Sequence, residues 1–183
     1  MLKIEKHKIK RKLTPSKNYF LSLARSIIYQ QISTEAGNSI YARFIKLFDR
    51  MKPTPKTFLN ISTAKLRSAG LSNQKISYMT DLAQKFLDGT VNPKLFKKMS
   101  DSKIKEHLVR VKGIGPWTAD MFLIFALNRP NILPVGDLAI VKGFQRVFGL
   151  KRPPSEKIMR KLAKPQDGRH THLSLYLWQA MDE

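Results

Sequence analysis

Apolar residues recur at intervals of three and four positions along most of the chain, the spacing of amphipathic α-helices. The first such run covers residues 17–31, where the apolar positions would line one face of a helix. These positions are Phe20, Leu23, Ala24, Ile27 and Ile28. No stretch alternates apolar and polar residues for long enough to predict a strand. The pattern therefore predicts an all-α fold.

Capping residues, prolines and glycines divide the rest of the chain into further helices. Side-chain oxygens of Ser, Thr, Asn and Asp cap helix N-termini, proline suits the first turn, and glycine often follows the last one. The predicted helices begin at Ser33 (to about Asp49), Thr54, Ser62 (to Ala69-Gly70), Ser72 (to Leu87), Asn92 (to about Lys98), Asp101 or Ser102, Pro116, Asp137 (to Phe148) and Ser155, and a last one follows Gly168 (to about Trp178). We expect about ten helices joined by short loops.

Residues 108–127 read LVRVKGIGPWTADMFLIFAL and hold the most informative local pattern. Gly113 and Gly115 flank one isoleucine between two helical runs, and residues without a Cβ permit a tight hairpin. The helix predicted from Pro116 has unpaired amide groups at the positive end of its dipole, which suit a phosphate. Asp137 comes later, in LPVGDLAIV. This combination predicts a DNA-backbone anchor beside a catalytic acid.

The charge of the chain indicates a polyanionic partner. Lys and Arg number 34 against 13 Asp and Glu, which gives a formal net charge of +21. Such an excess repels itself in a compact fold, so nucleic acid is the expected partner, with binding that weakens as salt rises. A generally lysine-rich proteome is the alternative explanation for the charge alone.

The sequence contains no cysteine, which excludes disulfides, zinc-thiolate sites and a cysteine-ligated iron–sulfur cluster. The basic start, MLKIEKHKIKRKL, has no apolar core of the kind found in signal peptides, and the apolar segment ADMFLIFAL is too short to cross a bilayer. We expect an intracellular protein with no membrane partner, in the cytoplasm or nucleoid of a prokaryote or the nucleus of a eukaryote. We also expect a monomer.

Residues 108–127 resemble the helix-hairpin-helix of the glycine/proline/aspartate superfamily of base-excision DNA glycosylases. GIGPWTADMFLIFAL and GDLAI are similar to its alkylation-repair branch, the 3-methyladenine DNA glycosylase II type. The resemblance extends upstream through LARSIIYQQISTEAGNSIYARF and LRSAGLSNQKISYMTDLAQKFLDG, and so over most of the chain. It implies two helical lobes within residues 16–183. The basic composition of residues 1–15 indicates an arm that is a solvated tail, lies on DNA or forms a short strand.

The resemblance also implies a monofunctional enzyme of base excision repair that acts on double-stranded DNA. It would flip out and hydrolytically release alkylated purines of the 3-methyladenine and 7-methylguanine type. Two other functions stay open at this point. One is a non-enzymatic DNA-binding module that uses the hairpin only to hold the backbone, and the other is a glycosylase for oxidised or mismatched bases.

Asp137 is the candidate catalytic residue. A carboxylate near C1′ stabilises the oxocarbenium character that develops on the sugar, or orients the attacking water. Spacing alone favours a helix cap at this position, whereas the match of GDLAI to the family favours catalysis, and one carboxylate can do both. The nearest rival acid is Asp120, for which a structural role is expected.

Three residues are candidates for the base pocket. The face of an electron-rich ring attracts a cationic purine, which makes Trp117 the first candidate and Tyr29 the second. Core packing is the alternative for each ring. Met121 stands where well-known bacterial relatives have a tyrosine, which puts the substrate range in doubt. Because bifunctional members carry a nucleophilic lysine at the position of Trp117, the resemblance implies no abasic-site lyase activity.

The remaining site predictions concern DNA and a cation. In the family, the turn after the first helix fills the gap left by a flipped base, a role that falls to Gln31 or else to Ile32, unless Ile32 packs inward. The hairpin residues expected to meet phosphate are Lys112, Gly113, Ile114 and Gly115. The carbonyl groups of Val109, Val111 and Ile114 match those that hold a structural monovalent cation, and no other cofactor is expected. His170 and His172 show no persuasive metal-ligand spacing, and either could instead face DNA.

Overall fold

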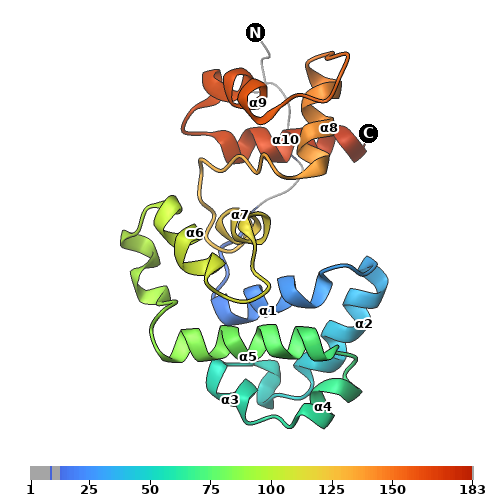
Figure 1. The fold of residues 1–183 in the computed structure, drawn as a ribbon, viewed down its shortest axis with the longest axis vertical. Coiled ribbons are helices and arrows are strands. Elements are labelled where there is room, and N and C mark those ends of the chain that lie inside the picture. Colours follow the sequence, from blue (N-terminus) through green and yellow to red (C-terminus); the bar gives the residue numbers. More distant parts are fainter. Residues whose placement is uncertain (1–8, 10–12, 183) are drawn as a thin grey trace. The chain divides into compact units, whose positions relative to one another are not determined.

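The computed structural model describes residue 9 and residues 13–182, and every regular element in this part of the chain is a helix (Figure 1). Ten α-helices are present there, which confirms the predicted all-α fold. The described residues from Ser16 onward divide into two compact units, Ser16–Ala119 and residues 120–182. The boundary lies inside α7 (Pro116–Phe125). Most of the predicted basic arm, residues 1–15, lies outside the described residues.

The first unit is organised around its longest helix, α5. Contacts with α1, α3 and α4 place α5 between α1 and the α3–α4 pair (Figure 1). Four phenylalanines, Phe20, Phe44, Phe58 and Phe96, are almost fully buried and form much of the core. The helices of this unit are α1 (Tyr19–Tyr29), α2 (Thr34–Ile45), α3 (Pro55–Leu59), α4 (Thr63–Ser68), α5 (Asn73–Leu87) and α6 (Asp101–Val109), with 3₁₀ turns at Asp49–Met51 and Pro93–Lys98.

Side-chain caps define most helix starts in this unit. Ser33, Thr54, Ser62 and Ser72 each accept a hydrogen bond from a backbone N–H of the first turn, as predicted. The prediction for α6 was wrong, since its cap is Ser100 and not Asp101 or Ser102. The Ser100 hydroxyl accepts from the N–H of residue 103, which leaves Asp101 in the first turn, where a negative charge suits the helix dipole.

The second unit is built on two helices that approach each other closely. Its elements are α8 (Leu138–Val147), α9 (Glu156–Ala163), a 3₁₀ turn at Lys164–Gln166 and α10 (His170–Asp182). Gly143 of α8 faces α10, and a Cβ added there would lie 2.9 Å from the carbonyl oxygen of Leu177. The core comprises Leu133, Ile140, Phe144, Met159, Ala163, Leu173 and Leu177.

Two helix ends differ from prediction. α2 ends at Ile45, before the predicted Asp49, and Arg50 adopts a left-handed φ of 49° within the following 3₁₀ turn. α10 continues beyond Trp178 to Asp182. No helix within the described residues combines the length and apolar character needed to cross a bilayer.

Candidate functional site

The predicted hairpin lies between α6 and α7, and its two glycines serve different purposes. Gly113 has a φ of 78°, and a Cβ there would lie 2.1 Å from Cδ2 of the Tyr78 ring, so only glycine fits. At Gly115 a Cβ would meet no atom of the described residues within 4 Å. Gly113 is therefore required by the protein itself, whereas the Cβ position of Gly115 lies in open space.

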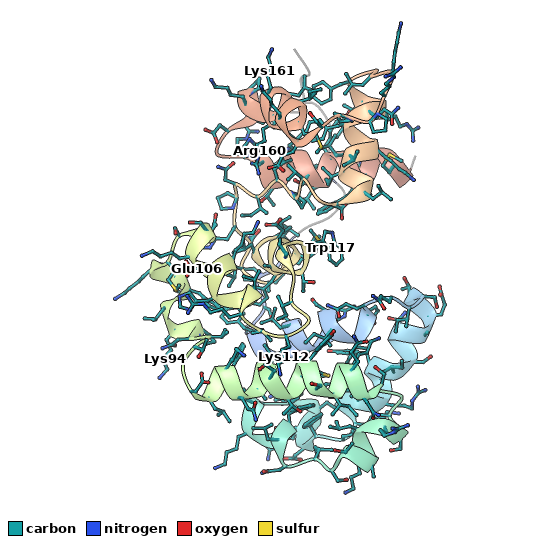
Figure 2. The ribbon with its side chains drawn as sticks, in the orientation of Figure 1. Lys94, Glu106, Lys112, Trp117, Arg160 and Lys161 are labelled. Atoms are coloured by element: carbon teal, nitrogen blue, oxygen red, sulfur yellow. The ribbon has the colours of Figure 1, made fainter. Side chains whose placement is uncertain are left out.

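The residues around Gly115 are exposed, except for Ile114 and the partly buried Gly113. Ile114 between the glycines is buried, and its N–H donates to the carbonyl oxygen of Val111 across 3.0 Å. Lys112, Gly115 and Trp117 are exposed, and the labelled side chains of Lys112 and Trp117 can be followed in Figure 2. The hairpin thus keeps its apolar side chain inside and presents glycine backbone, a cation and the start of α7, as an anion site requires.

Asp81 of α5 holds the hairpin in place within the first unit. Its Oδ2 accepts the backbone N–H of Lys112 at 2.8 Å, and both of its oxygens accept from Nζ of Lys85 at 2.7 and 2.8 Å. Burial opposes ionisation of Asp81, but the hydrogen bonds from Lys85 and Lys112 outweigh it and hold the pKa of this carboxyl below its usual value. The carboxylate is therefore a charged structural anchor at neutral pH.

The turn after α1 projects into solvent. Gln31 is exposed and adopts a left-handed φ of 59°, which is uncommon for a residue other than glycine. Ile32 is 36% exposed, so the alternative in which it packs inward is wrong. Ser33 caps α2, as expected. Both candidate wedge residues are thus available to a partner.

Asp137 lies at the N-terminus of α8 and is only 9% exposed. Its Oδ1 accepts the N–H of Ile140 at 2.9 Å, so the capping role holds. The same oxygen accepts the indole Nε1–H of Trp178 at 3.2 Å. The Trp178 ring stacks on Phe125 with a centroid distance of 5.7 Å and an interplanar angle of 27°. An aromatic donor held by stacking thus fixes the orientation of the carboxylate.

Sequence reasoning missed Trp178. The sequence pattern marks it only as the predicted end of the last helix, and it lies 41 positions from Asp137. The only available signal was its place in RHTHLSLYLW, the segment similar to the last helix of the family.

Hydrogen bonds from α10 also fix the loop that leads to Asp137. The Thr171 hydroxyl donates to the Arg129 carbonyl and accepts the N–H of Ile132 at 3.1 Å. The Ser174 hydroxyl donates to the Ile132 carbonyl at 3.0 Å. The helix that supplies the Trp178 donor therefore also anchors the backbone before the carboxylate.

The three predicted base-pocket residues have different environments. Trp117 is 47% exposed, so its indole is not a core side chain. Met121, four positions further along α7, is partly buried. The Tyr29 ring fills the space that a Cβ of Gly37 would need, and its hydroxyl bonds to Asn38. The second ring therefore supports the packing of α1 on α2, the structural alternative considered for it.

The rival acid is buried, and both histidines are partly buried. Asp120 is 7% exposed within α7. A ring nitrogen of His170 lies 3.2 Å from the carbonyl oxygen of Ala163, at the end of α9. His172 on α10 is partly buried. No group of three metal-ligating side chains occurs among the described residues.

Comparison with known proteins gives a consistent result. The sequence pattern of "HhH-GPD superfamily base excision DNA repair protein" matches residues 24–166. The chain is 30% identical to DNA-3-methyladenine glycosylase 1 of Schizosaccharomyces pombe over 165 residues, which is 89% of this chain and 72% of that protein. It is 34% identical to the DNA-3-methyladenine glycosylase of Saccharomyces cerevisiae over 174 residues, which is 91% of this chain and 58% of that protein.

A solved structure agrees with these sequence matches. The chain superposes on the S. pombe 3-methyladenine DNA glycosylase in complex with abasic DNA with a TM-score of 0.84 and 27% identity. The superposition covers 97% of this chain and 87% of that one. The chain thus spans between 58% and 87% of the length of these relatives.

Proposed function

Since the chain belongs to the HhH-GPD superfamily of base excision DNA repair proteins, we propose that it is a monofunctional DNA glycosylase. Its substrate is double-stranded DNA that carries an alkylated purine, and its product is an abasic site. The names of the S. pombe and S. cerevisiae relatives support this substrate class. Because the substrate is genomic DNA, the protein acts inside the cell.

The observation that carries this proposal is the paired arrangement of Asp137 and Trp178. The indole N–H and the first-turn amide of α8 both donate to Oδ1, so the direction of the carboxylate is fixed. A fixed anion of this kind stabilises the positive charge that develops at C1′ as the base departs. It also orients the water that completes the hydrolysis.

The exposed indole of Trp117 supplies base selection. A 3-alkylated or 7-alkylated purine is cationic, and a cation is attracted to the face of an aromatic ring. A cationic base also leaves with little need for protonation, so one carboxylate suffices. The partly buried Met121 contributes apolar surface on α7. Because it has no aromatic ring, the area available for stacking on the base is smaller than with a tyrosine at this position.

Trp117 also determines the fate of the abasic product. The indole has no nucleophilic amine, so no Schiff base to the sugar forms at this position. Borohydride added during turnover should therefore trap no covalent protein–DNA adduct, and the abasic strand should remain uncut until it is treated with alkali.

The backbone is gripped by the hairpin and by the turn after α1. The exposed Gly115 and Lys112 receive a phosphate, and Gln31 with Ile32 fills the space left by the flipped nucleotide. The carbonyl groups of Val109, Val111 and Ile114 hold a monovalent cation beside that phosphate. Val111 already accepts one N–H, and a carbonyl oxygen has a second lone pair for an ion. Replacing potassium by tetramethylammonium at constant ionic strength should therefore lower DNA affinity.

The test is base release from methylated duplex DNA by the Asp137→Asn variant. Asparagine still caps α8 but carries no charge, so folding persists while the rate of base release falls by roughly 10²–10³. DNA affinity is retained, because the phosphate grip lies elsewhere. Asp49→Asn is the matched control, since the Asp49 side chain is 96% exposed in a 3₁₀ turn of the other unit.

Each rival function predicts a different outcome. A non-enzymatic DNA-binding module would release no base even as the unmodified protein. A glycosylase for other lesions would release base from oxidised or mismatched duplexes and leave methylated ones intact. Base release that is unchanged by Asp137→Asn would exclude the proposed mechanism.

A further inference from the structure

The side chain of Gln30 connects two loops that are far apart in sequence. Gln30 ends α1, and its own backbone N–H donates to the carbonyl of Ile27. Its amide Nε2 donates to the carbonyl oxygen of Gly113 at 2.8 Å, across 83 positions of the chain. The contact is partly buried, and both residues belong to the unit Ser16–Ala119. A single side chain thus joins the end of α1 to the hairpin.

The position of Gln30 gives this bond its importance. The next residue is Gln31, whose left-handed φ of 59° turns the chain outward. The bonded carbonyl belongs to Gly113, whose φ of 78° creates the hairpin. The hydrogen bond therefore links the two backbone positions at which the exposed turn and the hairpin depart from ordinary geometry.

α5 holds the same two loops from its own side. Nζ of Lys75 donates to the carbonyl of Ile28 at the end of α1, at 2.6 Å. Tyr78 lies about one turn of α5 after Lys75, and its ring lies against Gly113. Asp81 lies about one turn further on and accepts the N–H of Lys112. With α5 bracing both ends, the Gln30 amide is the direct tie between them.

We propose that Gln30 is a positioning residue that sets the hairpin relative to the turn at Gln31–Ile32, so that phosphate binding and insertion into the duplex occur together. This inference rests on the proposed DNA glycosylase function. Gln30 acts through the Gly113 carbonyl and does not need to touch the reacting atoms. Loss of its donor leaves a partly buried carbonyl without this partner and loosens both loops.

The test is Gln30→Met, which keeps the length and volume of the side chain but removes its donor. Gln84→Met is the control, because Gln84 is exposed on α5 in the same unit. In the protein without DNA, the variant should raise amide hydrogen exchange in residues 112–115 by about tenfold, while exchange in the centre of α5 stays unchanged. The control should change neither.

With duplex DNA, a 2-aminopurine opposite the lesion reports insertion. At saturating protein, Gln30→Met should reduce the increase in 2-aminopurine fluorescence that insertion causes. It should also weaken DNA binding by about tenfold, because a misplaced hairpin and turn cannot both contact the same duplex. If Gln30 served only in packing, the Gln30→Met variant would match the unmodified protein in hydrogen exchange, fluorescence and DNA binding. This result would overturn the proposal. Weakened binding with unchanged exchange in the hairpin would also overturn it, since Gln30 would then contact DNA directly.

The two proposals fail in different ways. If the protein releases no methylated base, the proposed function is lost. The exchange measurement is made without DNA and still decides whether Gln30 holds the hairpin.

Discussion

The hairpin and the segment around Asp137 are both fixed by distant residues, but in opposite senses. At the hairpin, side chains from the end of α1 and from α5 hold a backbone whose own groups are proposed to bind phosphate. At Asp137, the backbone of α8 and the Trp178 indole hold a side chain that is itself the proposed catalytic group. The hairpin should therefore be sensitive to lost space or lost anchors, and the carboxylate site to the loss of a single donor.

The largest expected effect comes from Gly113→Ala, which tests the need for space at the hairpin. The new methyl would collide with the Tyr78 ring at 2.1 Å and would also occupy a left-handed φ of 78°. Overpacking and backbone strain together should lower the free energy of unfolding by about 3 kcal/mol. Urea denaturation measures this change.

Gly115→Ala is the matched comparison for that variant. With no described atom within 4 Å of the new Cβ, its stability should stay close to that of the unmodified protein. Its DNA affinity should fall, because the methyl occupies the space predicted for the phosphate. Equal stability losses in the two variants would contradict the different roles assigned to the two glycines.

Trp178→Phe tests the carboxylate site. Phenylalanine retains an aromatic face for Phe125 but donates no hydrogen bond to Asp137. The single-turnover rate of base release should fall by about tenfold, the effect of about 1.4 kcal/mol, with DNA affinity unchanged. Phe148→Leu, a change at a partly buried ring outside this contact, should lower stability without a comparable loss of rate.

Asp81→Asn has the smallest expected effect and tests the anchor of the hairpin by pH. The folded pKa of Asp81 lies below its usual value, so its ionised form stabilises the protein above the unfolded pKa of about 4. That contribution, on the order of 1 kcal/mol at neutral pH, should disappear as the pH falls through the lower folded pKa. Urea denaturation of both proteins from pH 7 downward should show their difference shrinking. A difference that is constant with pH would show that the carboxylate charge is not responsible.

The starts of most helices could be predicted because capping is a local interaction. Ser33 and Ser72 each reach an N–H only three residues ahead, so the sequence around them suffices. At Ser100-Asp101-Ser102 three neighbouring residues all suit a cap, and local rules do not distinguish them. In the structure Ser100 is the cap, and its hydroxyl accepts a hydrogen bond from the N–H of residue 103.

The candidate site was only partly predictable for the same physical reason. Gly113 and Asp137 stand in short motifs, and their surroundings in sequence indicate a turn and a helix start. The contacts of Trp178 with Asp137 and of Gln30 with Gly113 span 41 and 83 positions. Such contacts depend on how helices pack, and no nearby residue signals them.

The hydrogen bonds of Thr171 and Ser174 to the loop before Asp137 have a consequence for how this protein can vary. α10 provides both these hydrogen bonds and the Trp178 donor, so Asp137 and the residues of α10 that position it have to be exchanged together. A recombination point between residues 137 and 170 would pair the acid of one parent with the α10 of another. Chimeras of that design would fold around a carboxylate aimed in the wrong direction, whereas exchanges within α2–α4 would leave it untouched.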